Sequence, residues 1–274
     1  MIPIINLWLA TALMLSPLAA GAPAASDDWV ETPYGWSRIA FTDRFQRLDV
    51  GPGRTWGWQT GAYRDDCRGN THDFKSDYLT PTALSAADGR LTITARPAAD
   101  GRWDTGLITT GDSCDTGGSG AEVRTGDLLL AQVRLPAANT GAWPALWTWR
   151  DGRNELDVFE WHADRPDTLE FVNQVHSGTG QYTSPDIAAG GWLWIGARFG
   201  AENTTWYVGT APDALHPVYQ DGTGVGEDFA AYVVLSLSVN NGVYHTAPTT
   251  DTPASLAAEE ITVYRPAPPG LPDK

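Results

Sequence analysis

Apolar and polar positions alternate in several short runs along the chain, and this alternation predicts β-strands. In residues 90–96, Leu91, Ile93 and Ala95 fall on one face, and the turn pair Asp88-Gly89 precedes the run. The same alternation, or a similar richness in β-branched and aromatic residues, recurs in residues 129–135, 169–176, 192–199, 204–208, 232–239 and 261–264. Clusters of Gly, Pro, Asn and Asp separate these runs.

Helical periodicity is almost absent from the pattern. No run of 12 or more residues shows it convincingly, and residues 253–260 are expected to form only a short turn of helix. Many short strands joined by irregular loops favour an all-β fold, a two-sheet antiparallel jelly-roll sandwich. The chain has no internal repeat, so we expect a single domain, residues 26–265, followed by an extended Pro-rich tail, residues 266–274.

The composition fits one folded domain and excludes some partners. Of the 274 residues, 42% are hydrophobic and 19% are charged, which allows a packed core. The chain has 13 Trp and 9 Tyr but only two Met, which is unusual for a helix bundle. Its formal net charge is −15, from 33 acidic and 18 basic side chains. Nucleic acid and anionic membranes are therefore not expected as partners, because both need a basic protein face.

The N-terminal segment predicts export. Residues 1–26 carry no charged side chain, residues 4–15 are mostly apolar, and small residues follow. This pattern predicts a signal peptide, residues 1–25, that is cleaved near Ala24 or Ala25. An uncleaved anchor is the alternative, but the apolar part is shorter than the roughly 18–20 residues of a membrane span. We expect a secreted, extracellular monomer without membrane contact after cleavage.

Cys67 and Cys114 are the only two cysteines of the chain. In an oxidising compartment, a lone pair of cysteines predicts a disulfide, here across a 47-residue interval. Two unpaired thiols too far apart to bond are the alternative.

Three carboxylates are concentrated in residues 154–161, which read Asn-Glu-Leu-Asp-Val-Phe-Glu-Trp. Apolar residues separate them, so the segment is predicted to be a half-buried strand. Glu155 and Asp157 share a face because they are two apart, whereas strict alternation sends Glu160 to the other face. A β-bulge at Val158–Phe159 would absorb one residue and bring all three acids onto one surface.

Crowded carboxylates differ in their affinity for protons. Like charges disfavour joint ionisation, so at least one of the three acids has a raised pKa. A two-carboxylate glycosidase needs this difference, because one carboxylate acts as nucleophile while the other is protonated at the same pH. The neighbouring Trp residues fit a sugar site, since aromatic faces stack on pyranose rings.

The acidic strand follows the segment Gly141-Ala142-Trp143-Pro144-Ala145-Leu146-Trp147. Together the two resemble glycoside hydrolase family 16, whose Glu-x-Asp-x-x-Glu or Glu-x-Asp-x-Glu strand often follows a Gly-x-Trp-Pro-Ala-x-Trp segment. Further runs look like strands of that family, so the resemblance extends weakly over most of the mature chain: residues 90–96, 106–110, 205–208 and 261–264. The resemblance implies a concanavalin-like sandwich and a retaining enzyme.

The resemblance also implies a role for each acid. Glu155 matches the nucleophile and Glu160 the general acid/base. Asp157 matches the carboxylate that bonds to the nucleophile and helps to separate the two pKa values. His176 resembles a family histidine on a nearby strand that faces the substrate, with a structural histidine as the alternative.

Two tryptophans are expected to contact the sugar. We expect Trp143 and Trp161 to act as platforms for pyranose rings, although packing in the core is the alternative for either of them. Trp147, deeper in its motif, is expected to be a packing residue.

The substrate class follows from the motif and the charge. The bulged, six-residue form of the acidic strand resembles laminarinase-like, agarase and carrageenase enzymes. A chain of net charge −15 would repel a sulfated galactan, so we expect a neutral polysaccharide, namely a 1,3- or mixed 1,3-1,4-linked β-glucan that is cleaved internally. Agarose, transglycosylation and a non-catalytic lectin-like glycan-binding protein are the alternatives.

No cofactor is expected to be required. The chain has no His/Cys cluster with zinc spacing. Members of the family often hold a structural Ca²⁺, which an acidic chain could bind, and the sequence identifies no ligands for it.

Overall fold

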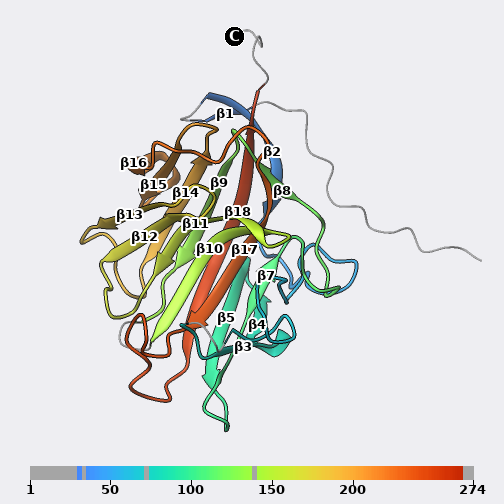
Figure 1. Cartoon of the computed structure of the whole chain (residues 1–274), viewed down its shortest axis with the longest axis vertical. Helices are drawn as coiled ribbons and strands as arrows, with labels where there is room; N and C mark the ends of the chain where they lie inside the picture. Colours follow the sequence, from blue (N-terminus) through green and yellow to red (C-terminus); the bar gives the residue numbers. More distant parts are fainter. Residues whose placement is uncertain (1–29, 33–34, 71–73, 138–140, 268–274) are drawn as a thin grey trace, which may run out of the picture.

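Two mainly antiparallel sheets make up the structure, a computed structural model that describes residues 30–32, 35–70, 74–137 and 141–267 (Figure 1). The larger sheet contains β1 (Val30–Thr32), β2 (Gly35–Asp43), β3 (Asp77–Leu79), β4 (Leu84–Ala87), β5 (Arg90–Pro97), β6 (Trp103–Thr105), β9 (Leu128–Arg134), β14 (Trp192–Phe199), β15 (Thr204–Gly209), β16 (His216–Gln220) and β18 (Ala254–Pro266). The smaller sheet contains β7 (Leu107–Thr109), β8 (Glu122–Arg124), β10 (Ala142–Arg150), β11 (Arg153–Trp161), β12 (Thr168–Asn173), β13 (Gly178–Thr183) and β17 (Ala230–Val239).

The strand order of each sheet crosses the sequence many times, as in a jelly roll. The larger sheet runs β16-β15-β14-β9-β18-β5-β6-β3, with β1, β2 and β4 paired at its sides. The smaller sheet runs β13-β12-β11-β10-β17-β7, and β8 also pairs with β17. Within the described residues the helical elements are two short 3₁₀ turns, Pro81–Ala83 and Pro212–Ala214. The predicted all-β sandwich is therefore confirmed.

Alternation along the strands builds one core between the sheets. Apolar side chains of β9, β14 and β18 pack against those of β10, β11 and β17, and most of them are fully buried. The opposite face of the smaller sheet carries Trp143, Trp147 and the three carboxylates of β11. The fold thus separates an apolar inner face of β11 from a polar outer one.

The short turn of helix expected at residues 253–260 is wrong. These residues begin β18, a central strand that pairs with both β5 and β9. Leu256 lies opposite Ile93, Ala258 lies opposite Val133, and all four side chains are buried. Pairing on both edges and burial in the core override a weak local preference for helix.

The predicted signal peptide and residues 268–274 of the predicted tail lie outside the described residues. No helix in the described part of the chain is long and apolar enough to span a membrane.

Cys67 and Cys114 form the predicted disulfide, with their Cα atoms 6.5 Å apart. It ties the connection before β3 to the loop that follows β7.

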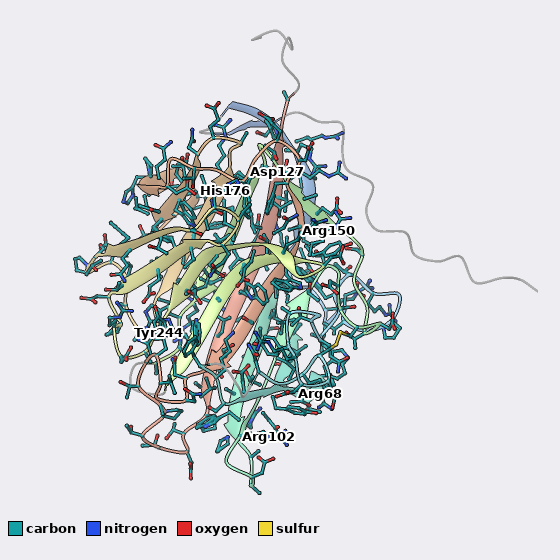
Figure 2. All side chains as sticks on the ribbon, in the orientation of Figure 1. Arg68, Arg102, Asp127, Arg150, His176 and Tyr244 are labelled. Carbon is teal, nitrogen blue, oxygen red and sulfur yellow. A yellow bond between two sulfur atoms is a disulfide. The ribbon has the colours of Figure 1, made fainter. Side chains whose placement is uncertain are left out.

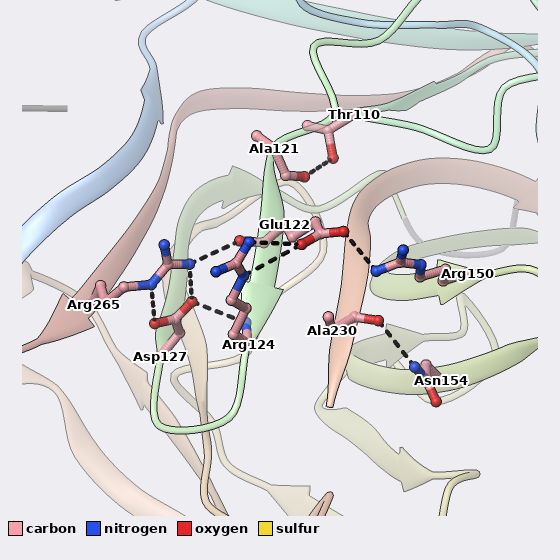
Figure 3. A network of polar contacts seen from close by, with 9 residues as sticks. All are labelled: Thr110, Ala121, Glu122, Arg124, Asp127, Arg150, Asn154, Ala230 and Arg265. Atoms are coloured by element: carbon pink, nitrogen blue, oxygen red, sulfur yellow. Dashed lines mark hydrogen bonds and ion pairs between the residues drawn. The ribbon is translucent and has the colours of Figure 1, made fainter. Parts of the chain in front are cut away.

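A buried ion pair ties β18 to the connection between β8 and β9 (Figure 3). Asp127 accepts hydrogen bonds from Arg265 Nε at 3.0 Å and Nη2 at 2.7 Å, and from the backbone N–H of Arg124 at 2.9 Å. Its side chain is 1% exposed. Arg265 also donates to the carbonyl oxygen of Glu122 in β8, at 3.2 Å, so the pair links the two sheets.

Replacing Asp127 with Ala is expected to lower the free energy of unfolding by about 3 kcal/mol, because it leaves the Arg265 guanidinium without its counter-charge. The matched control is Arg44→Ala, which removes the exposed pair of Arg44 with Glu260 and is expected to cost less than about 1 kcal/mol. Urea unfolding followed by Trp fluorescence measures both. Equal losses in the two variants would contradict this account of the ion pair.

Candidate active site

The three carboxylates of β11 lie on the outer face of the smaller sheet because β11 contains a bulge. Against β10 the register skips Val158, and against β12 the two residues Val158 and Phe159 lie opposite a single residue. Both side chains are fully buried in the core. The extra residue returns Glu160 to the face of Glu155 and Asp157, so the predicted bulge is confirmed at the predicted place.

Burial raises the pKa of all three acids, but by different amounts. Burial raises the pKa of Glu160 to about 7, although the Lys75 ammonium and a hydrogen bond from Trp143 act in the opposite direction. Burial also raises the pKa of Asp157 well above its usual range, and the charges of Glu160 and Glu155 add to the effect. For Glu155, burial raises the pKa and Lys75 alone opposes it. The face can therefore hold a protonated Glu160, the state that a general acid needs, up to about pH 7.

Trp143 lies directly beside Glu160. Its Nε1 donates a hydrogen bond to Glu160 Oε1 at 2.8 Å. Lys75 Nζ lies 4.6 Å from the centroid of its ring, and the ring of His162 lies 4.7 Å away. These neighbours leave Trp143 7% exposed. The structure therefore gives Trp143 a role in orienting Glu160, and its contact with sugar stays a prediction.

The expected sugar platform at Trp161 is corrected by the structure. Trp161 is fully buried in the core, and its Nε1 donates to the carbonyl oxygen of Pro166 at 3.0 Å. The physical reason is the bulge itself, since a residue that follows Glu160 directly must face the opposite side of the sheet. Trp161 thus packs between the sheets.

The expected position of His176 on a strand facing the carboxylates is also corrected. Strand β12 ends at Asn173, and His176 lies in the turn before β13. Its Nδ1 lies 2.9 Å from the carbonyl oxygen of Gly224, which also accepts a hydrogen bond from the buried side chain of Asn173. Asn173 lies opposite the buried Leu156, on the inner face of the sheet. Figure 2 shows His176 well apart from Tyr244, which packs near Trp143.

Lys75 is a charged residue of the site that the sequence expectations missed. It comes from the connection before β3, and its ammonium lies 4.6 Å from the ring centroid of Trp143 and 5.2 Å from that of Tyr63. The Tyr63 hydroxyl donates to the fully buried Asp77 at 3.0 Å and lies 3.1 Å from Ser238 Oγ. The scarcity of lysine could have drawn attention to this residue, because Lys75 and Lys274 are the only lysines in the sequence.

A fourth carboxylate, Glu170, lies next to Glu160 on the neighbouring strand. The two residues are direct partners in the β11–β12 register, and the charge of Glu170 helps to raise the pKa of Glu160. Glu170 forms an ion pair with Arg165 and accepts a hydrogen bond from the Tyr244 hydroxyl at 3.1 Å. The alternation in β12 placed Glu170 on this face, but only the strand register brings it to Glu160.

One group of side chains in the described residues has the composition of a metal site: His162, Glu170 and His245, with ligand atoms within 4.8 Å of one another. Arg165 Nη2 contacts Glu170 and lies 3.0 Å from His245 Nε2, so a cation of the chain already occupies this place. The two imidazole rings stack in parallel, 3.5 Å apart at 9°, and their nitrogen lone pairs do not converge on one point. The group does not fit the convergent ligands that zinc needs.

Exposed aromatic surface beside the acids comes from two loops. Tyr244, 52% exposed, follows β17, and Phe74, 46% exposed, precedes β3. Their ring centroids are 5.7 Å apart, and that of Tyr244 is 6.2 Å from Trp143. No local pattern predicts this pair, because Phe74 and Tyr244 are far apart in the sequence and meet only in the folded structure.

The fold has known counterparts among solved structures, although the sequence matches no family model and no curated protein. The endo-β-1,3-glucanase from Pyrococcus furiosus superposes with a TM-score of 0.66 at 18% identity, over 86% of this chain and 97% of that one. The β-glucanase of Bacillus licheniformis gives 0.63 at 15%, over 83% and 98%. SCLam, a non-specific endo-β-1,3(4)-glucanase from family GH16, gives 0.65 at 17%, over 91% and 98%.

These likenesses establish the class of fold. The chain has the jelly-roll sandwich that is found in endo-β-1,3- and endo-β-1,3(4)-glucanases, over nearly the whole length of those proteins. The resemblance of its sequence motif and the likeness of its fold therefore point to the same group of proteins.

Proposed function

We propose that this chain belongs to glycoside hydrolase family 16 and is a retaining, endo-acting hydrolase of a neutral β-glucan. The observation that carries the proposal is the outer face of β11, where a bulge aligns Glu155, Asp157 and Glu160 and burial raises the pKa of Glu160 to about 7. A site that only binds sugar has no need for crowded carboxylates of unequal proton affinity. The fold of known endo-β-glucanases supports the same conclusion.

The proposed reaction is a double displacement. Protonated Glu160 donates its proton to the glycosidic oxygen while the Glu155 carboxylate attacks the anomeric carbon, so the glycosidic bond breaks and a glycosyl ester forms. Glu160, now ionised, then takes a proton from water, which attacks the same carbon and releases Glu155. Two inversions retain the configuration. The Trp143 hydrogen bond holds Glu160 in place, and Asp157 is assigned the support of Glu155.

The proposed substrate is a 1,3- or mixed 1,3-1,4-linked β-glucan. The structural neighbours are described as endo-β-1,3- and endo-β-1,3(4)-glucanases, and the net charge of −15 favours a neutral glycan. Tyr244 and Phe74 offer the exposed aromatic surface on which a pyranose ring could stack. Agarose remains the alternative glycan, and transglycosylation would use the same residues with a sugar acceptor in place of water.

The location of the protein, its oligomeric state and its need for cofactors are proposed from the sequence alone. We expect a secreted monomer that needs no cofactor, and a structural Ca²⁺ stays a prediction of the family resemblance.

The product profile on laminarin, lichenan and agarose tests the proposed function. Release of oligosaccharides from laminarin or lichenan is expected, whereas release from agarose alone would reassign the substrate. Release from none of the three, together with measurable binding to one of them, would favour the lectin-like alternative.

The alkaline limb of the pH profile is a prediction of its own. Because a raised pKa keeps Glu160 protonated up to about pH 7, kcat/KM on laminarin is expected to fall above that value as the general acid loses its proton. Initial rates across the pH range give the limb. An alkaline limb that persists unchanged in Glu160→Gln would assign it to another group.

A further inference from the structure

Lys75, the only lysine in the described residues, lies in the carboxylate site. We propose that Lys75 is a positioning residue, whose ammonium group acts on the reaction through Glu155 and Glu160. The inference rests on the proposed function and adds a residue to the same site.

The geometry places the ammonium over the ring that bonds to Glu160. Lys75 Nζ lies over the ring of Trp143, 4.6 Å from its centroid, and the same ring donates its Nε1 hydrogen to Glu160 at 2.8 Å. The ammonium also lies over the ring of Tyr63, at 5.2 Å from its centroid. Two aromatic rings therefore hold the ammonium, and the indole of Trp143 links it to Glu160, the proposed general acid.

The backbone fixes the position from which Lys75 reaches the site. The N–H of Ser76 donates to the carbonyl oxygen of Val239 at 2.9 Å, and the N–H of Asn241 donates to that of Phe74 at 3.1 Å. Both neighbours of Lys75 are thus bonded to the end of β17, the strand beside β10 and its Trp143. The lysine is held by the fold, and its half-buried side chain is directed along the outer face of the smaller sheet.

Lys75 supplies a positive charge to a face that carries mainly acidic groups. The titratable and charged groups around it come from every element packed there: Tyr63 before β3, Asp77 in β3, Glu155, Asp157 and Glu160 in β11, His162 after β11, Arg165 and Glu170 at β12, and Tyr244 and His245 after β17. Arg165, the other permanent cation in this set, is already paired with Glu170.

The charge of Lys75 persists across the working pH range. Burial alone would lower its pKa, but the charges of Tyr63 and Asp77, followed by those of Glu160 and Glu155, outweigh burial and raise the pKa. In turn, the ammonium opposes the rise in the pKa of each β11 acid that burial causes. Without Lys75, burial would raise the pKa of Glu155 with no charge to oppose it.

The first test compares pH–rate profiles of wild type, Lys75→Met and Lys75→Arg on laminarin. Lys75→Met is expected to shift the acid and alkaline limbs of kcat/KM upward by about one pH unit, because an opposite charge close to a carboxylate has been removed. Lys75→Arg keeps the charge and is expected to keep the limbs near the wild-type positions. A Lys75→Met profile that is lower but has unmoved limbs would overturn the proposal and leave Lys75 a packing residue.

The second test needs neither activity nor a stable Met variant. Labelling with [ε-¹³C]lysine gives two resonances, from Lys75 and Lys274, and Lys75→Arg assigns them. The Lys75 signal is expected to shift with a midpoint near pH 7 as Glu160 ionises, and this step is expected to vanish in Glu160→Gln. A flat Lys75 signal between about pH 5 and pH 9 would overturn the proposal. If glucans are not hydrolysed but the step is present, the proposed function fails and the Lys75 coupling stands.

Discussion

Glu155→Gln is expected to reduce kcat on laminarin by at least about 10⁴-fold, because an amide oxygen does not form the glycosyl ester that divides the reaction into two easier steps. The side chain keeps its size, and Glu155 is half-buried on the outer face of the sheet, so the core is untouched. Initial-rate assays on laminarin measure the loss.

The control for this variant separates catalysis from folding. Glu202→Gln changes an exposed glutamate in the turn between β14 and β15 and is expected to leave kcat within about twofold, as surface substitutions usually do. Both variants should retain the wild-type unfolding midpoint in thermal denaturation. Normal turnover by Glu155→Gln would remove the assignment of the nucleophile.

Glu160→Gln is expected to lower kcat on laminarin by about 10²–10⁴-fold, the range of general acid–base catalysis. The loss should depend on the leaving group. An aryl β-glucoside oligomer with an acidic phenol needs no proton for departure, so its first step should be nearly unaffected and the glycosyl-enzyme should accumulate. Azide, which needs no general base, should restore turnover and give a β-glycosyl azide. Stopped-flow release of the phenol and mass spectrometry of the product test this.

Two outcomes would contradict the role of Glu160. An equal loss on laminarin and on the aryl substrate would mean that Glu160 does not protonate the leaving group. An α-linked azide product would mean that the reaction does not pass through an ester on the opposite face of the sugar.

The main features of the fold and of the acidic strand could be predicted from the sequence because both depend on local periodicity. Alternation predicted several of the longer strands, among them β5, β9 and β14, but not short ones such as β3 and β6. The spacing of Glu155, Asp157 and Glu160 predicted the bulge. The same rule, applied one residue further, places Trp161 on the inner face, so its correction was available from the sequence. Helix at residues 253–260 was wrong because pairing with β5 and β9, which are distant in sequence, decides the conformation there.

The remainder of the site depends on contacts between distant segments. Lys75 reaches the ring of Trp143, and through it the neighbourhood of Glu160, only because its neighbours pair with the end of β17. Glu170 reaches Glu160 through the register of β11 and β12, and Tyr244 reaches Trp143 through the loop after β17. Local periodicity shows which face of a strand a residue occupies but not which distant segment lies beside it, so these residues become visible only in the folded structure.

Retention of configuration can be followed in the ¹H NMR spectrum of laminarin during its first minutes of digestion by the wild-type protein. New reducing ends are expected to be β-anomers first and then to equilibrate with the α-anomers by mutarotation. Reducing ends that are first α-anomers, or no new reducing ends at all, would contradict a retaining β-glucan hydrolase built on Glu155 and Glu160.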